Sequence, residues 1–157
     1  HGPGAAWLLL GHRWTRPGFG MNSPAGRLYR RNAKVLLLGV GYGNCTMLHM
    51  AETLDQPIDV RVTVDDVRFE KPDPQFFAYT RGVLATQGIL FENILHVAQS
   101  QYHDIGVAMR LGYQTCWIER RFAQKGTGGT LESERTEPHY HFTSLAQLAD
   151  AVEKELG

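Results

Sequence analysis

The sequence predicts a three-layer α/β sandwich built on a mostly parallel, Rossmann-like sheet. Short apolar runs recur along the chain, and stretches with helical periodicity separate most of them. Strands that alternate with helices at this spacing are typical of parallel sheets, because parallel neighbours need a long crossover connection. The apolar content of 43% and charged content of 20% are those of an ordinary globular domain, and 157 residues can bury one sizeable core.

The beginning of the chain differs from the rest in composition. Residues 1–33 are rich in Gly, Pro and Arg, so we expect a mostly irregular segment with at most one short helix or strand at 5–10. A single α/β domain is expected over 34–157. Its first element is the apolar run Ala33–Val40, which ends in glycines and is typical of a strand buried on both faces.

The later elements are placed by the residues that start and stop helices. Asp73 is a good helix N-cap and Pro74 a good first helical residue, so a helix is expected from there to about Thr86. Ser144–Gln147 is a capping-box pattern that opens a last amphipathic helix. We also expect helices at Thr46–Leu54 and Tyr102–Leu111, strands at Ile58–Val64, Ile94–Ala98, Gln114–Glu119 and Tyr140–Phe142, and a glycine-containing loop at 122–138.

The composition argues against several classes of protein. No apolar run is long enough to span a membrane, and His1–Gly4 lacks the charged and apolar regions of a signal peptide. Cys45 and Cys116 form no CxxC pair and are expected to be reduced thiols of a cytoplasmic protein. A solvated face is the commoner role of arginines such as Arg27, Arg30 and Arg31, so we expect no nucleic-acid partner.

Two separated motifs point to hydrolase chemistry. Lys71–Pro74 has the sequence KPDP, and His96–Ile105 (HVAQSQYHDI) is a buried strand that leads into a polar loop containing an acid. Together with Trp117–Arg121 (WIERR), they resemble the C-terminal half of the haloacid dehalogenase (HAD) superfamily, closest to the 2-haloacid dehalogenase type. The resemblance covers about residues 56–157 and implies a HAD-like fold.

The resemblance also implies roles for the residues of these motifs. Lys71 would neutralise a carboxylate nucleophile and the charge that builds on the intermediate in a dry site. Ser100 and Asp104 would orient the nucleophile and the hydrolytic water, and Gln99 and His103 are candidate substrate-binding residues. Because Gln99 replaces the first of two Mg²⁺-holding acids of HAD phosphatases, we expect no metal and no cofactor.

The nucleophile-bearing strand of HAD enzymes, with its DxDxT or DxxGT motif, is missing from the sequence, and so is the cap domain. Covalent catalysis of this type cannot start without a nucleophile, so we expect an incomplete or inactive hydrolase. Asp65 and Asp66 are the first candidates for a replacement carboxylate. A Ser100–His103–Asp104 triad is disfavoured, because three residues of one loop rarely face each other correctly.

The N-terminal part has a different resemblance. Ser23–Tyr29 (SPAGRLY), Leu36–Gly41 (LLLGVG) and Leu48–Glu52 (LHMAE) are similar to motifs of the aminoglycoside 3-N-acetyltransferase family. This resemblance implies that His49 is a general base for a substrate amine, that Glu52 orients it, and that acetyl-CoA is the cofactor.

The two resemblances meet near residues 52–56, and we expect the strand at 34–40 to fill the sheet position of the missing HAD strand. Three functions remain open. The first is an incomplete HAD-like hydrolase of the haloacid dehalogenase type, with a small-molecule substrate if it is active. The second is an acetyltransferase remnant. The third is a non-enzymatic chimeric or designed scaffold that self-associates. A homodimer is the arrangement in which a second copy could supply the missing nucleophile.

Overall fold

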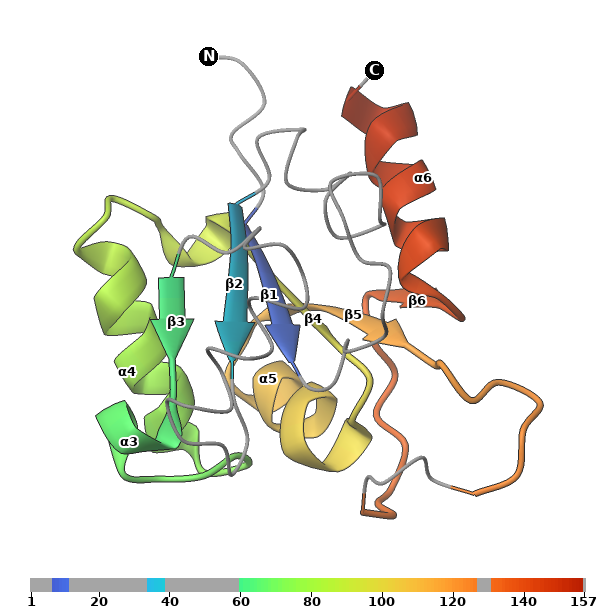
Figure 1. Cartoon of the computed structure of the whole chain (residues 1–157), viewed down its shortest axis with the longest axis horizontal. Helices are drawn as coiled ribbons and strands as arrows, with labels where there is room; N and C mark the ends of the chain where they lie inside the picture. Colours follow the sequence, from blue (N-terminus) through green and yellow to red (C-terminus); the bar gives the residue numbers. More distant parts are fainter. Residues whose placement is uncertain (1–6, 12–33, 39–59, 127–130, 157) are drawn as a thin grey trace.

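The computed structural model describes residues 7–11, 34–38, 60–126 and 131–156 (Figure 1). Its described strands form one six-stranded sheet in the order β3-β2-β1-β4-β5-β6, and every neighbouring pair is parallel. This confirms the expected α/β class with a parallel sheet. The strands are β1 (Trp7–Gly11), β2 (Lys34–Leu38), β3 (Val60–Val62), β4 (Ile94–Ala98), β5 (Gln114–Ile118) and β6 (Tyr140–Phe142).

The order of the first two strands corrects our expectation. β2 is the expected apolar strand, but it lies one position further out, between β1 and β3. The place beside β4 belongs to β1, from the segment expected to be mostly irregular, and the register pairs Gly11 with Ala98. Both runs are apolar, and a buried parallel strand requires little else. The apolar pattern therefore predicts that a strand exists, but it does not predict the position of that strand in the sheet.

Two of the described helices begin where the sequence predicts them. α4 (Pro74–Ala85) starts after Asp73, whose Oδ1 accepts a hydrogen bond from Gln75 N at 2.8 Å. α6 (Leu145–Leu156) starts after Ser144, whose Oγ accepts from Gln147 N at 3.2 Å. The remaining helices are α3 (Val64–Val67), a 3₁₀ turn at Phe91–Asn93, a π-helical turn at Gln101–Ile105 and α5 (Gly106–Arg110).

The main core lies between β3 and β4 of the sheet and the helices α4 and α5. Phe76, Phe77 and Tyr113 are its largest fully buried side chains. Burying one such side chain stabilises the fold by about 1.5–3 kcal/mol. The cluster consists of Val62, Phe76, Phe77, Leu84, Ile89, Ile94, Val107, Ala108 and Tyr113.

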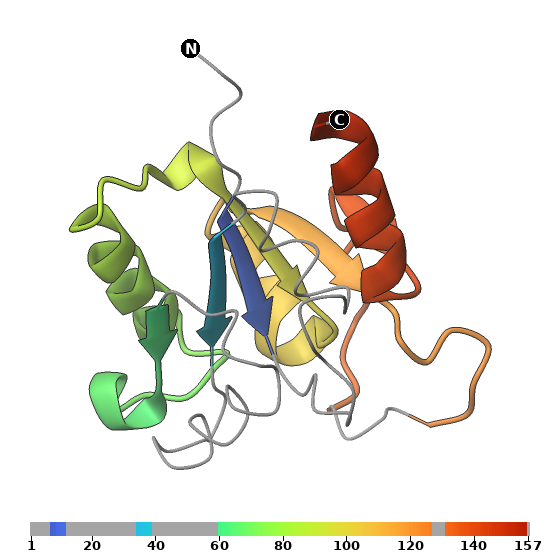
Figure 2. The same ribbon diagram turned by 45° about the horizontal axis from the view of Figure 1, so that its top comes forward.

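The last helix lies at the opposite end of the sheet from α4, next to β6 (Figure 2). Leu145 and Leu148 are buried as expected, and Val152 is half-buried. The expected helix at Thr46–Leu54 lies outside the described residues. Within the described part of the chain, no helix has the length and apolarity that a membrane span requires.

Candidate functional site

The described site is a cluster of three buried polar side chains. Lys71 Nζ lies 2.5 Å from Asp104 Oδ1, and His96 Nε2 lies 3.0 Å from the same oxygen. All three side chains are fully excluded from solvent. A buried charge is tolerated when it is paired, and Lys71 and Asp104 provide that pairing for each other.

Local structure brings the members of this cluster together. Lys71 lies in the turn before α4, and His96 lies in the middle of β4. Asp104 follows β4 in the π-helical turn, which Ser100 caps by accepting a hydrogen bond from His103 N at 3.0 Å. The carboxyl edge of a parallel sheet is where α/β proteins place their sites, and the connections before α4 and after β4 both reach it.

The charge state of Asp104 follows from its neighbours. Burial alone would raise the pKa of Asp104, but the charge of Lys71 and the hydrogen bond from His96 outweigh burial and hold this pKa well below its usual range. The side chain is therefore a carboxylate at neutral pH. Its Oδ2 is buried and has no hydrogen-bond partner among the described residues.

His96 is a neutral imidazole in this cluster. Burial lowers its pKa below the ordinary value, although the hydrogen bond to Asp104 acts in the opposite direction. A carboxylate only accepts hydrogen bonds, so His96 Nε2 carries the ring proton and donates a hydrogen bond to Asp104 Oδ1. The ring packs against Phe77 and Tyr113, with centroids 5.4 and 6.1 Å away. His96 was not among the predicted site residues, although an imidazole inside an otherwise apolar strand is a signal of a buried polar contact.

Ser100 and His103 also lie in contact, with Ser100 Oγ 3.1 Å from His103 Nδ1. Burial lowers the pKa of His103 as well. Asp104, however, directs Oδ1 at Lys71 and His96. Ser100 and His103 thus lie closer together than we expected. The Asp104 carboxylate, by contrast, contacts Lys71 and His96 and does not complete a triad. The catalytic and substrate-binding roles implied for Ser100, Gln99 and His103 stay predictions.

The residues present do not fit the Mg²⁺ ion that HAD phosphatases use. Gln99 offers a neutral amide where a carboxylate is needed, and the Lys71 ammonium already contacts the Asp104 carboxylate. Among the described residues, no three His, Cys, Asp or Glu side chains gather in a way that could hold a metal ion.

The other carboxylate candidates lie in the connection after β3. Asp66 Oδ2 accepts hydrogen bonds from Thr63 N at 2.8 Å and from Thr63 Oγ1 at 3.0 Å, which caps α3. Asp65 and Asp66 are both exposed. A capping role therefore explains why Asp66 is here. His49 and Glu52 lie outside the described residues.

Comparisons with solved structures identify the class of fold. The chain is similar to HAD-like dehalogenases and phosphatases. It is 19% identical to an L-2-haloacid dehalogenase with a TM-score of 0.67, and the match covers 82% of this chain and 54% of that one. An uncharacterised protein from Listeria monocytogenes matches over 95% of this chain and 97% of its own length, at 14% identity and a TM-score of 0.68. The fold is therefore HAD-like.

Comparison with protein families gives a different ancestry. The family model for aminoglycoside 3-N-acetyltransferases matches residues 1–117 of the 157, so the chain belongs to this family. The curated aminoglycoside N(3)-acetyltransferase IX of Micromonospora chalcea is 41% identical over 71 residues, which is 45% of this chain. The match covers only 24% of that relative. An acetyltransferase sequence match and a HAD-like fold in one chain are consistent with a chimera.

Proposed function

We propose that this chain is a HAD-like hydrolase domain of the 2-haloacid dehalogenase type that has lost its nucleophile and does not turn over. The observation that carries the proposal is the buried pair of Lys71 and Asp104, 2.5 Å apart. The pair keeps the lysine and the acid that the HAD resemblance implies. It lies beside a sheet whose central strand, β1, ends at Gly11 in register with Ala98 of β4.

The proposed loss of activity rests on the lack of acidic residues in β1 and β2. Residues 1–51 contain no Asp and no Glu, so neither β1 nor β2 can present a carboxylate. In the dehalogenase reaction, a carboxylate oxygen attacks C2 of the 2-haloacid, halide leaves with the bonding electrons, and water then hydrolyses the ester. With no carboxylate on β1, the Lys71 ammonium is neutralised by Asp104 instead of by a nucleophile.

The test is halide release from 2-chloropropionate by the purified chain, with Lys71→Met as the control. Methionine keeps much of the length of the lysine side chain and removes its charge. We expect equal release from both proteins, at the background rate of buffer. Release by the wild-type chain that Lys71→Met abolishes, with the variant still folded by near-UV circular dichroism, would overturn the proposed inactivity.

The family match supports a second candidate function, an acetyltransferase remnant. Here His49 would take the proton from a substrate amine, Glu52 would orient His49, and acetyl-CoA would donate the acetyl group. Because the chain corresponds to about a quarter of its curated relative, the activity of the whole enzyme is a proposal for this chain.

Ligand-induced stabilisation tests this second candidate, because a ligand that binds only the folded state raises the melting temperature. Acetyl-CoA should raise the melting temperature of the wild-type chain if the transferase site persists, and an aminoglycoside amine should then be acetylated by the wild-type chain but not by His49→Ala. An unchanged melting temperature at saturating acetyl-CoA would eliminate the candidate.

A further inference from the structure

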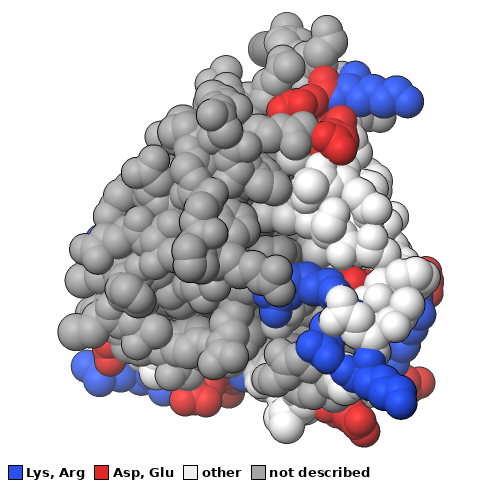
Figure 3. Space-filling view, turned by 45° about the vertical axis from the view of Figure 1, so that its right-hand side comes forward, with Lys and Arg blue, Asp and Glu red and all other residues white. Residues whose placement is uncertain are grey.

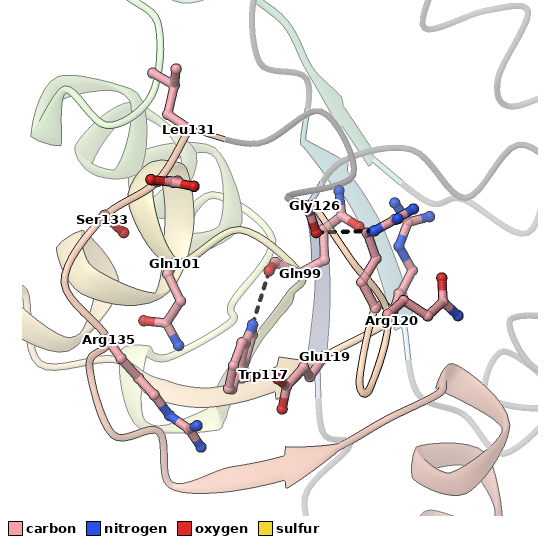
Figure 4. Close-up of a pocket in the computed structure, with 12 residues that line it drawn as sticks. Gln99, Gln101, Trp117, Glu119, Arg120, Gly126, Leu131, Ser133 and Arg135 are labelled. Carbon is pink, nitrogen blue, oxygen red and sulfur yellow. Dashed lines mark hydrogen bonds between the residues drawn. The ribbon is translucent and has the colours of Figure 1, made fainter.

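A pocket of about 320 Å³ lies at the ends of β4 and β5 (Figure 4). Gln99 lines it from the end of β4, Trp117 and Glu119 from β5 and its end, and the segment 131–135 from the far side. The volume is at the lower end of the range for small-molecule sites, and the carboxyl edge of an open parallel sheet is where such sites form. Apart from Gln99, a candidate substrate-binding residue, the lining residues have no role in the proposed hydrolase chemistry.

Hydrogen bonds hold the walls of the pocket in place. The side-chain amide of Gln101 bonds to the backbone of Thr136 twice: Oε1 accepts from Thr136 N at 2.8 Å, and Nε2 donates to Thr136 O at 3.2 Å. On the opposite wall, Trp117 Nε1 donates to Gln99 O at 2.9 Å. The contacts between Gln101 and Thr136 tie the segment that follows the glycine-containing loop to the turn after β4. These bonds hold the segment that contains Arg135 close to the turn after β4.

The charge of the lining favours an anion. Three guanidinium groups, from Arg120, Arg121 and Arg135, line the pocket together with two carboxylates, Glu119 and Glu132. Glu119 Oε2 lies 2.8 Å from His141 Nε2, and three guanidinium groups against two carboxylates leave the lining with a net positive charge. Figure 3 shows Lys and Arg side chains gathered on this side of the molecule.

The guanidinium groups of the lining differ in how they are held. Arg135 Cζ lies 4.8 Å from the centroid of the Trp117 ring, whose plane is stacked on His141 at 4.7 Å. Arg121 Nε donates to Gly126 O at 3.1 Å, which fixes the side chain against its own turn. Arg120 and Arg135 come from different walls, and Figure 4 places them on opposite sides of Trp117. A ligand between them would meet cationic groups from two directions.

One hydrogen-bond donor in the lining of the pocket has no partner within the described part of the chain. Gln99 Nε2 is buried and has no hydrogen-bond partner among the residues that the structure describes. A buried polar group without a partner is unfavourable, and such groups in folded proteins call for an explanation. A rotation of the Gln99 side chain toward the pocket would let this amide donate to an anionic oxygen there.

We infer that the pocket binds a small molecule through an oxyanion group, a carboxylate or a phosphate. The planar guanidinium fork matches both groups, since each presents two oxygens side by side. The Arg120 and Arg135 side chains supply the charge, and the Gln99 amide supplies a neutral donor. The binding needs no nucleophile, so it is a function that the chain can have whether or not it turns over a substrate.

The test is a titration of the ¹⁵N-labelled chain with inorganic phosphate and, separately, with acetate, each at constant ionic strength against sodium chloride. The indole signal of Trp117, assigned with Trp117→Phe, and the side-chain amide of Gln99 report on the pocket. Arg120→Gln and Arg135→Gln each remove one guanidinium. Lys154→Gln, on the exposed face of α6, removes the same charge elsewhere and is the matched control.

We expect saturable shifts of the two reporters with at least one of the anions, weakened roughly tenfold or more by either arginine variant, which is the effect of losing a charge-assisted hydrogen bond. Lys154→Gln should leave the affinity unchanged. Saturation by phosphate alone or by acetate alone assigns the ligand group. Shifts no larger than those of chloride, or shifts that both arginine variants leave intact in folded protein, would overturn the inference.

Discussion

Lys71 Nζ lies 2.5 Å from Asp104 Oδ1, and neither side chain reaches solvent. The two residues are 33 positions apart in sequence and come from the connections before α4 and after β4. The HAD resemblance implies a lysine that faces a nucleophile, whereas the Lys71 of this chain faces the acid. The pair neutralises itself, so in this chain it contributes to the fold, and it can contribute to chemistry only if a third charged group is supplied.

Removing both members of the Lys71–Asp104 pair should cost less unfolding free energy than the sum of removing each alone. Lys71→Met or Asp104→Asn leaves a buried charge without its partner, which typically costs about 3–5 kcal/mol of unfolding free energy. The double variant Lys71→Met/Asp104→Asn should be less destabilised than the sum of the two single variants. Urea-induced unfolding of the four proteins measures the coupling. Strictly additive effects would contradict the buried contact.

The stability of the fold should fall between pH 7 and pH 5. The unfolded chain protonates His96 near its ordinary pKa of 6.5, whereas burial lowers the pKa of His96 in the folded state. Below pH 6.5 the unfolded state thus binds more protons, and the loss approaches about 1.4 kcal/mol per pH unit for one fully buried group. Asp104 acts in the same direction, but only at lower pH. Its pKa is lowered on folding, so its contribution is complete above the unfolded value near 3.8 and is lost as the pH falls below it.

Urea unfolding at pH 5, 6 and 7 measures this dependence, with His96→Gln as the variant. Glutamine can still donate a hydrogen bond to Asp104 but does not titrate. We expect the slope of unfolding free energy against pH to be smaller in His96→Gln. A slope equal to that of the wild-type chain would show that His96 does not remain neutral in the folded protein.

Magnesium should leave the melting temperature unchanged. The Asp104 carboxylate is paired with an ammonium group, and Gln99 is a poor ligand for a hard dication. A ligand that binds only the folded state would raise the melting temperature, so thermal unfolding with millimolar MgCl₂, compared with NaCl of equal ionic strength, is the measurement. An increase that is absent in Asp104→Asn would contradict the metal-free assignment.

The thiol of Cys116 should be inert in the folded chain. Its side chain is buried in β5, and burial raises the pKa of the thiol to about 12. Thiolate is the reactive species, so almost none is present at pH 8. In a Cys45→Ser background, Ellman's reagent should not react with Cys116 of the folded protein. When urea is added, the rate of the reaction should equal the rate of unfolding. Immediate reaction without denaturant would show that the strand is accessible.

The sequence predicted elements well where local signals were strong. The bounds of β4 agree with the predicted strand, and α4 begins at Pro74 after the Asp73 cap, because capping and proline geometry act over a few residues. The position of β1 at the centre of the sheet was not predicted. Two apolar runs compete for that position, and no local signal distinguishes them.

The site was predicted in part, for a related reason. Lys71 and Asp104 were identified through their motifs, and the structure brings them into contact. Lys71 and Asp104 pair with each other because β1 has no carboxylate that could bind the lysine. Neither of their motifs contains this information. His96 and the arginines of the pocket were not predicted as a group, because residues from β4, β5 and the segment 131–135 meet only after folding.

Intact-protein mass spectrometry after incubation with 2-chloropropionate tests whether the chain holds the Lys71–Asp104 pair without a nucleophile. Attack by a carboxylate would leave an ester on the chain, and peptide mapping would locate it. We expect no ester on the wild-type chain and a Lys71-dependent ester on Gly11→Asp, because Gly11 is the residue of β1 in register with Ala98 of β4. An ester on the wild-type chain that Lys71→Met abolishes would show that the chain does hold a nucleophile.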